Sequence, residues 1–187
     1  MKINYLLFFI ALTLGYGCAK APTNQVTIKG VVTNAINDKA AFIGSDTTYS
    51  TVLDDKGAFE VTFSLDTATY LSFSHGTETT RMFVYPGDQI TLAIDPTEFD
   101  ETISYQGSAT SSYLANKFML RENSDLLGAA FYRSNTNEYA AVMDQYKQAL
   151  SASMSAITDS NFIAQELAET NEMIGSYIKY HDGIADY

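Results

Sequence analysis

The stretch FEVTFSL, residues 59–65, decides the fold because its apolar and polar residues alternate without a break. A period of two places every apolar side chain on one face of an extended chain, which is typical of a strand with one buried face. The same alternation opens residues 26–32 (VTIKGVV) and recurs in residues 90–94 (ITLAI). These three segments predict a β-sheet structure with one face covered.

Shorter β-like segments lie between these three, and turn sequences separate them. In YPGD, residues 85–88, Pro presets φ and Gly accepts a positive φ, which predicts a type II turn; DDKG, residues 54–57, predicts a hairpin turn. Strands about every ten residues predict an antiparallel β-sandwich, or an open barrel, of about seven or eight short strands over residues 25–107. The shorter segments are residues 40–44, 49–53, 69–74 and 81–85.

The hydrophobic period changes after Gly107. Residues 108–121 have helical spacing with Ser108 as a cap, and residues 137–157 carry a clearer apolar stripe. A third helix is expected to open at Asp159 or Ser160 and to end near Gly183. Strands followed by about three α-helices, without alternation, predict the α+β class, with a helical segment at residues 108–187.

The N-terminus has the order of an export signal. Lys2 precedes the apolar run YLLFFIALTL, residues 5–14, and small residues lead to Cys18. A transmembrane helix needs about 20 apolar residues, so this run is too short to span a bilayer. The cysteine resembles the acylated residue of lipoprotein signals, with Gly15 where Leu is usual. We expect a signal peptide at residues 1–17, lipidation of Cys18 and a tether at residues 18–24; a plain secretory signal is the alternative.

Composition narrows the classes of function. The net charge of −11 disfavours binding to nucleic acid, and 46% apolar residues exclude a disordered chain. A single cysteine allows no intramolecular disulfide, no C-x-x-C motif and no Cys-based zinc site. If Cys18 is acylated, thiol chemistry within this sequence is excluded.

The sequence contains few candidates for catalytic or metal-binding residues. His75 and His181 lie far apart without a third ligand at diagnostic spacing, so both are interpreted as exposed or hydrogen-bonded residues. No G-x-S-x-G, P-loop or G-x-G-x-x-G motif occurs. We therefore expect no catalytic, cofactor or metal site. One cluster of acids is interpreted as solvated turn residues rather than as a calcium or acid–base site: Asp95, Glu98, Asp100 and Glu101.

Tyrosine is abundant, with thirteen residues and no tryptophan. Tyr139, Tyr146 and Tyr177 occupy stripe positions and are assigned to packing. An exposed aromatic stripe could bind a carbohydrate or a partner, but the sequence does not assign the other tyrosines of the helical half, Tyr132, Tyr180 and Tyr187.

Several segments resemble a known family. They resemble the N-terminal domain, of unknown function, of envelope thiol-disulfide reductases of the alkyl-hydroperoxide-reductase/thiol-specific-antioxidant, thioredoxin-like type. In that family a thioredoxin-like domain with a reactive cysteine pair follows, and this sequence does not contain it. The resemblance implies a shared fold and compartment and transfers no catalytic residue. The segments are residues 28–30, 55–59, 82–92 (MFVYPGDQITL), 105–107 (YQG) and 112–118 (SYLANKF).

A weaker resemblance, to transthyretin-like or carboxypeptidase-regulatory-like domains, also implies a sandwich. From these observations we expect a non-catalytic, lipid-anchored accessory module facing the periplasm from the outer membrane, which holds a partner such as a thioredoxin-like domain. One alternative is the truncated N-terminal part of an oxidoreductase whose thioredoxin domain lies beyond residue 187. Another is a carbohydrate- or peptide-binding lipoprotein.

Overall fold

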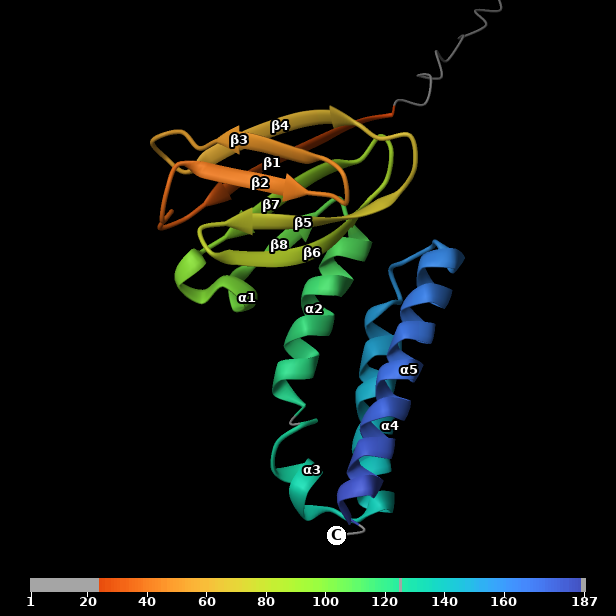
Figure 1. Ribbon diagram of the computed structural model, residues 1–187. Helices are drawn as coiled ribbons and strands as arrows, with labels where there is room; N and C mark the ends of the chain where they lie inside the picture. The colour runs from red at the N-terminus through yellow and green to blue at the C-terminus, as the bar shows by residue number, and fades with distance from the viewer. Residues whose placement is uncertain (1–23, 125, 186–187) are drawn as a thin grey trace, which may run out of the picture.

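The computed structural model describes residues 24–124 and 126–185. The predicted signal peptide, Cys18 and residues 18–23 of the predicted tether lie outside the described residues. The described part consists of a β-sandwich from which helices project in one direction (Figure 1).

The sandwich contains eight strands in two four-stranded sheets. The first sheet has the order β4 (Ala58–Ser64), β1 (Gln25–Val32), β7 (Gln89–Ile94) and β8 (Ser104–Gln106). The second has the order β3 (Thr48–Val52), β2 (Lys39–Ile43), β5 (Thr69–His75) and β6 (Glu78–Val84). The predicted α+β class and sandwich are confirmed.

One pair of strands departs from the predicted antiparallel arrangement. Strands β1 and β7 run parallel, with Thr27 opposite Gln89 and Val32 opposite Ile94. The chain visits the second sheet twice between these strands, so β7 returns in the direction of β1. The turn at residues 54–57 is also not a hairpin turn, because β3 and β4 pair within different sheets.

The alternating residues fill the space between the sheets as the sequence predicts. Ile28, Leu92 and Phe73 are fully buried, and the ring centroids of Phe42 and Phe73 are 5.4 Å apart. Burial of such side chains contributes roughly 1.5–3 kcal/mol each, so this core is the main source of stability of the sandwich.

Two glycines fix the path of the chain at the end of the sandwich that carries the helices. Gly87 has φ = 89°, and the Asp88 amide donates to the Tyr85 carbonyl oxygen at 3.2 Å, as the predicted type II turn requires. Gly107 has φ = 85°, and a Cβ there would collide with the carbonyl oxygen of Gln89. Only glycine therefore suits the junction between strands and helices.

Three long helices run side by side away from this end: α2 (Ala109–Asn123), α4 (Thr136–Ser153) and α5 (Ser160–Ala185) (Figure 1). A short helix, α3 (Ala129–Arg133), lies at their far end. The 3₁₀-helix η1 (Pro96–Glu98) and helix α1 (Phe99–Thr102) connect β7 to β8. No helix in the described ranges is long and apolar enough to cross a membrane.

The helix starts follow the capping chemistry of the sequence. The Ser111 amide donates to Ser108 Oγ at 3.2 Å, so the predicted cap of α2 is confirmed. Asn135 and Glu138 form a capping box at the start of α4. Asp159 Oδ1 accepts from the amides of Asn161 and Phe162, so Asp159 caps α5.

Two predicted helix ends are wrong. Helix α4 stops at Ser153, and residues 154–157 form a turn closed by the Ile157 amide and the Met154 carbonyl. Helix α5 continues through Gly183 to Ala185. A glycine costs about 1 kcal/mol in a helix, and contacts of the last turns with α3 outweigh that cost.

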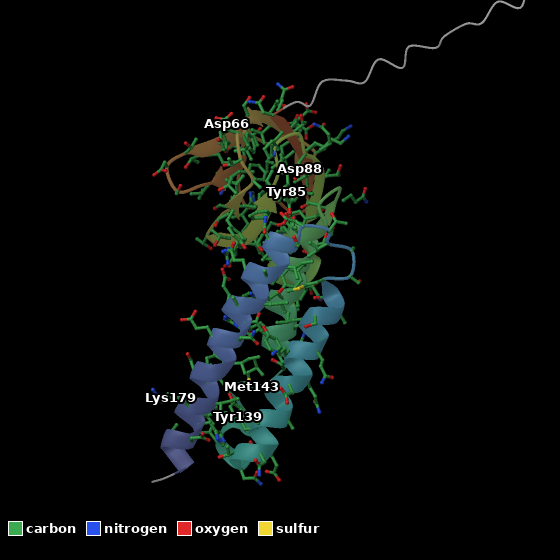
Figure 2. The ribbon with its side chains drawn as sticks, turned by 90° about the vertical axis from the view of Figure 1, so that its right-hand side faces the viewer. Asp66, Tyr85, Asp88, Tyr139, Met143 and Lys179 are labelled. Atoms are coloured by element: carbon green, nitrogen blue, oxygen red, sulfur yellow. The ribbon has the colours of Figure 1, made fainter. Side chains whose placement is uncertain are left out.

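The helices have a core of their own that extends into the sandwich. Tyr139, Met143 and Leu150 are fully buried between the helices, as Figure 2 shows for the first two. Phe83 of β6 belongs to this core rather than to the core between the sheets. The helical segment is thus continuous with the sandwich through β6.

Candidate functional site

The junction between sandwich and helices contains a fully buried carboxylate, Glu166 of α5. Its Oε2 lies 2.7 Å from Lys117 Nζ of α2, and its Oε1 accepts a hydrogen bond of 2.8 Å from the Tyr70 hydroxyl of β5. Both carboxylate oxygens are therefore satisfied by protein groups. A buried charge requires this, because an unpaired carboxylate in an apolar surrounding is strongly unfavourable.

Sequence reasoning missed Glu166, although a signal exists. Phe162, Glu166 and Thr170 are spaced four residues apart, and Met173 follows after three, so all four share one face of α5. The buried Phe162 and Thr170 show that this face is turned inward. A charged residue on a buried helix face indicates a partner of opposite charge.

Arg81 of β6 covers the outer side of this cluster. Its guanidinium lies 3.7 Å from the centroid of the Tyr70 ring and 3.5 Å from Glu169 of α5. Burial raises the pKa of the Tyr70 hydroxyl, and the hydrogen bond to Glu166 raises it further. The Arg81–Glu169 pair is half-exposed on both sides and contributes little to stability.

A pocket of about 240 Å³ opens next to this cluster, and we call it the Arg121 pocket. Arg81, Lys117 and Arg121 supply three cations, and Asp100 of α1 supplies one carboxylate. It is lined by Thr79, Thr80, Arg81, Asp100, Leu114, Lys117, Phe118, Arg121, Tyr146 and Met173. In a protein with a net charge of −11, this concentration of cations is unusual.

Two residues that line the Arg121 pocket, the buried Tyr146 and the exposed Arg121, have side-chain polar groups that form no hydrogen bond or ion pair with a described residue. The side chain of Tyr146 is 3% exposed, and its hydroxyl has no hydrogen-bond partner. Burial raises the pKa of Tyr146, while the nearby Arg121 guanidinium lowers it. That guanidinium forms no ion pair with any described residue.

The two histidines lie in different parts of the fold and have structural contacts. His75 Nε2 accepts from the Ile36 amide at 3.0 Å, and its Nδ1 lies 2.8 Å from the Lys39 carbonyl oxygen. Nδ1 therefore donates to this carbonyl oxygen, and His75 ties the loop before β2 to the start of β2. His181 stacks on Tyr139 with ring centroids 4.4 Å apart, and its Nε2 lies 3.0 Å from the Ser134 carbonyl oxygen.

Asp95 and Asp100, two of the clustered acids, have different surroundings in the structure. Asp95 caps η1 through the Thr97 amide and also accepts from the Asn34 side chain, and these hydrogen bonds lower its pKa. Asp100 lines the Arg121 pocket, and burial together with the neighbouring Glu101 raises its pKa. Within the described residues, no group of three or more His, Cys, Asp or Glu side chains has the arrangement of a metal site.

The tyrosines of the helical half differ in burial. Tyr139 and Tyr146 are buried as predicted, and Tyr177 packs half-buried against the helical core. Tyr132 and Tyr180 are 71% and 60% exposed and flank the buried Phe131, with ring centroids 5.0 and 5.4 Å from it. Tyr187 lies outside the described residues.

Tyr180 forms part of an apolar surface on α5. Ile184, 41% exposed, lies one turn after Tyr180 and lines the same shallow groove on α5. We call Tyr132, Tyr180 and Ile184 the distal patch, because they lie at the end of the helices that is far from the sandwich (Figure 1).

Comparisons of this chain with protein-family models, with curated proteins and with solved structures find no match. The resemblance to the N-terminal domain of thioredoxin-like reductases therefore stays a prediction.

Proposed function

We propose that this chain is a non-catalytic, lipid-anchored interaction module of the cell envelope that binds a thioredoxin-like domain at the distal patch. The observation that supports this function best is the exposure of two tyrosines and an isoleucine on α3 and α5, at the end of the helices far from the sandwich. Tyrosine is enriched at protein interfaces, where its ring packs and its hydroxyl stays hydrated.

The position of the distal patch agrees with this role. The described chain begins at Asn24 beside the sandwich, and the patch lies at the opposite end of the helices (Figure 1). Residues 18–24 span at most about 24 Å when extended, so an acylated Cys18 would hold the sandwich near the bilayer. The distal patch would then face away from the membrane, where a second domain has room.

The choice of partner rests on the family resemblance. In the reductases that this chain resembles, the thioredoxin-like domain follows the helices. Helix α5 ends at Ala185, one residue after the patch residue Ile184. A domain in that position, in the same chain or supplied by another, would lie against the distal patch.

Site-specific photo-cross-linking in the envelope tests the partner. A cross-linking amino acid replaces Tyr180 in the full chain, and the matched control replaces Val52, which is 65% exposed on the sandwich. We expect a thioredoxin-like protein to cross-link at position 180 and not at position 52. Equal cross-linking at both positions, a partner of another class, or no product would contradict the proposal.

The anchor has a separate test. Mass spectrometry of the mature N-terminus should find an acylated Cys18, and Cys18→Ala should release the protein from the membrane fraction. A Cys18→Ala protein that still carried lipid would refute this part.

A further inference from the structure

Strand β3 lies at the edge of its sheet, and the backbone groups on its outer side form no hydrogen bond with a described residue. We propose that this edge binds an extended basic segment of another protein as an added β-strand. The site lies on the sandwich, away from the distal patch (Figure 1). Its partner is distinct from the thioredoxin-like domain, so a cross-link at position 52 that is absent at position 180 would come from this edge.

The sandwich has four edge strands, and three of them are protected. The hydroxyls of α2 bond to the backbone of β6 at Phe83, and β8 has only three residues. In β4, the Ala58 carbonyl oxygen accepts from the Asp54 amide at 2.8 Å. The Glu60 carbonyl oxygen of β4 accepts from Thr51 Oγ1 at 3.1 Å. Covered or very short edges resist pairing with another chain.

The backbone of β3 lacks this protection. Its ladder with β2 continues to a hydrogen bond of 2.9 Å from the Leu53 amide to the Asp38 carbonyl oxygen. In an antiparallel pair, alternate residues direct their backbone groups to the partner strand, so Tyr49 and Thr51 also bond to β2. The backbone groups that point away from β2 belong to Thr48, Ser50 and Val52.

The sequence of β3 favours pairing with a further strand. Its residues, TYSTV, contain β-branched and aromatic side chains and neither a charge nor a proline. Val52 is 65% exposed, so a β-branched residue of an added strand could pack against it as a cross-strand neighbour. In such complexes the main-chain hydrogen bonds supply affinity and the side-chain contacts supply specificity.

The charge around β3 determines its occupant. Residues 38–60 contain five carboxylates and two lysines. Three of these carboxylates lie in the loops at the two ends of β3: Asp46, Asp54 and Asp55. A second copy would bring the same acidic edge against this one, which is unfavourable, whereas a segment with Lys or Arg is attracted. The geometry and the charge therefore select a basic extended segment over another copy of this chain.

Binding of synthetic peptides to the full chain, measured by calorimetry, tests the proposal. The probe is a short capped peptide of valines and threonines with lysines at its ends. One control peptide has glutamates in place of the lysines, and a second has two adjacent prolines at its centre, which prevent strand pairing. We expect the lysine peptide to bind with a Kd at or below about 1 mM and both controls at least about tenfold more weakly.

Amide proton chemical shifts locate the peptide on the chain. The Ser50 and Val52 amides should move downfield because they gain a hydrogen bond to the peptide. The Tyr49 and Thr51 amides already donate to β2, so their shifts should change less. This alternation along β3 distinguishes an added strand from a peptide that only lies on the face of the sheet.

Two variants and one control variant test the edge itself. Val52→Lys should weaken binding of the lysine peptide by about tenfold or more, because it places a cation at the edge. Ser50→Pro removes an outward amide and should have a similar effect. Leu127→Lys makes the same change of charge at a 52% exposed residue between α2 and α3, and should leave binding unchanged.

Several results would overturn the proposal. They are the absence of binding of the lysine peptide at millimolar concentration, equal binding of either control peptide, and shift changes without alternation along β3. Unchanged affinity in Val52→Lys, or the same loss in Leu127→Lys, would place the peptide elsewhere; Val52→Lys decides this even where Ser50→Pro does not fold. Sedimentation that finds a dimer of the unliganded chain, lost in Val52→Lys, would assign the edge to a second copy.

Discussion

Glu166 shows how a single residue can join three elements of this protein. Its two oxygens contact Tyr70 of β5 and Lys117 of α2, while its own backbone belongs to α5. Desolvation of both charges offsets much of their attraction, so the pair adds little net stability over apolar residues of the same size. Its geometry nevertheless fixes the rotation of α5 relative to α2 and the sandwich.

Removal of one partner of this pair should be far more harmful than removal of both. Lys117→Met leaves the Glu166 carboxylate buried without its cation, which should lower the free energy of unfolding by about 3 kcal/mol. The double variant Lys117→Met/Glu166→Leu should recover most of this loss. Urea denaturation of the full chain measures both values.

Lys179→Met is the control, because Lys179 is an exposed lysine on the outer side of α5 (Figure 2). It should change the free energy of unfolding by less than about 0.5 kcal/mol. If Lys117→Met behaved like Lys179→Met, the buried pair would not hold the junction.

At the scale of elements, side chains from the first turn of α2 form hydrogen bonds with the backbone of the edge strand β6. The Phe83 amide donates to Ser111 Oγ at 3.2 Å, and the Phe83 carbonyl oxygen accepts from Thr110 Oγ1 at 3.0 Å. An edge strand with free backbone groups invites association with another chain. The hydroxyls of α2 satisfy this edge where the helices leave the sandwich.

Elements with a strong local signal could be predicted, and elements held by tertiary contacts could not. The alternation in residues 59–65 gave β4, and the Ser108 cap gave the start of α2. The three residues of β8 are too few to show a period, and their pairing with β7 is a long-range contact. Gly183 locally favours a helix end, but α5 continues through it, and its last turns pack on Phe131 through Tyr180 and His181.

The start of α5 should depend on pH through Asp159. Its carboxylate accepts from the Phe162 and Asn161 amides and, at 2.9 Å, from the Tyr85 hydroxyl. The Phe162 amide and the Tyr85 hydroxyl lower the pKa of Asp159 below its ordinary value of 3.8. Its stabilisation is therefore complete above that value and is lost as the pH falls through the lowered pKa.

Asp159→Ala should lower the melting temperature by a few degrees at neutral pH, and the difference from the unmodified chain should shrink as the pH falls below 3.8. Thermal unfolding followed by circular dichroism at several pH values measures this. Asp144→Ala, on an exposed position of α4, is the matched control and should show no such dependence. A constant difference across the pH range would exclude the carboxylate as the cause.

The described residues form two cores, and the helical core reaches the sandwich through aromatic rings of β5 and β6. One core lies between the sheets, and the other lies between the helices and includes Phe83 of β6. Phe162 of α5 packs on the sandwich within the helical core, with its ring centroid 4.9 Å from Phe83 of β6 and 5.9 Å from Tyr113 of α2. The helices are thus held to the sandwich by packing as well as by the Glu166 cluster.

The way in which whole elements meet around the Arg121 pocket could not be predicted from the sequence. The helical spacing of Lys117 and Arg121 is visible in the sequence, but the Arg121 pocket also needs β6, α1, α4 and α5. Which of these elements meet depends on the crossing of the chain between the sheets and on the path through Gly107. Neither has a local pattern, so the pocket could not be predicted.

Truncation of Phe162 should destabilise the helical core more than the core between the sheets. Phe162→Ala removes a ring that is 2% exposed, which should lower the free energy of unfolding of the helical unit by about 3–5 kcal/mol. The sandwich keeps its own core, so amide hydrogen exchange should become faster in α4 and α5 while β1 and β7 keep their protection. Phe42→Ala, in the core between the sheets, is the matched control and should reduce protection in β1 and β7. Equal loss of protection in both parts of Phe162→Ala would mean that the sandwich cannot stay folded without the helices.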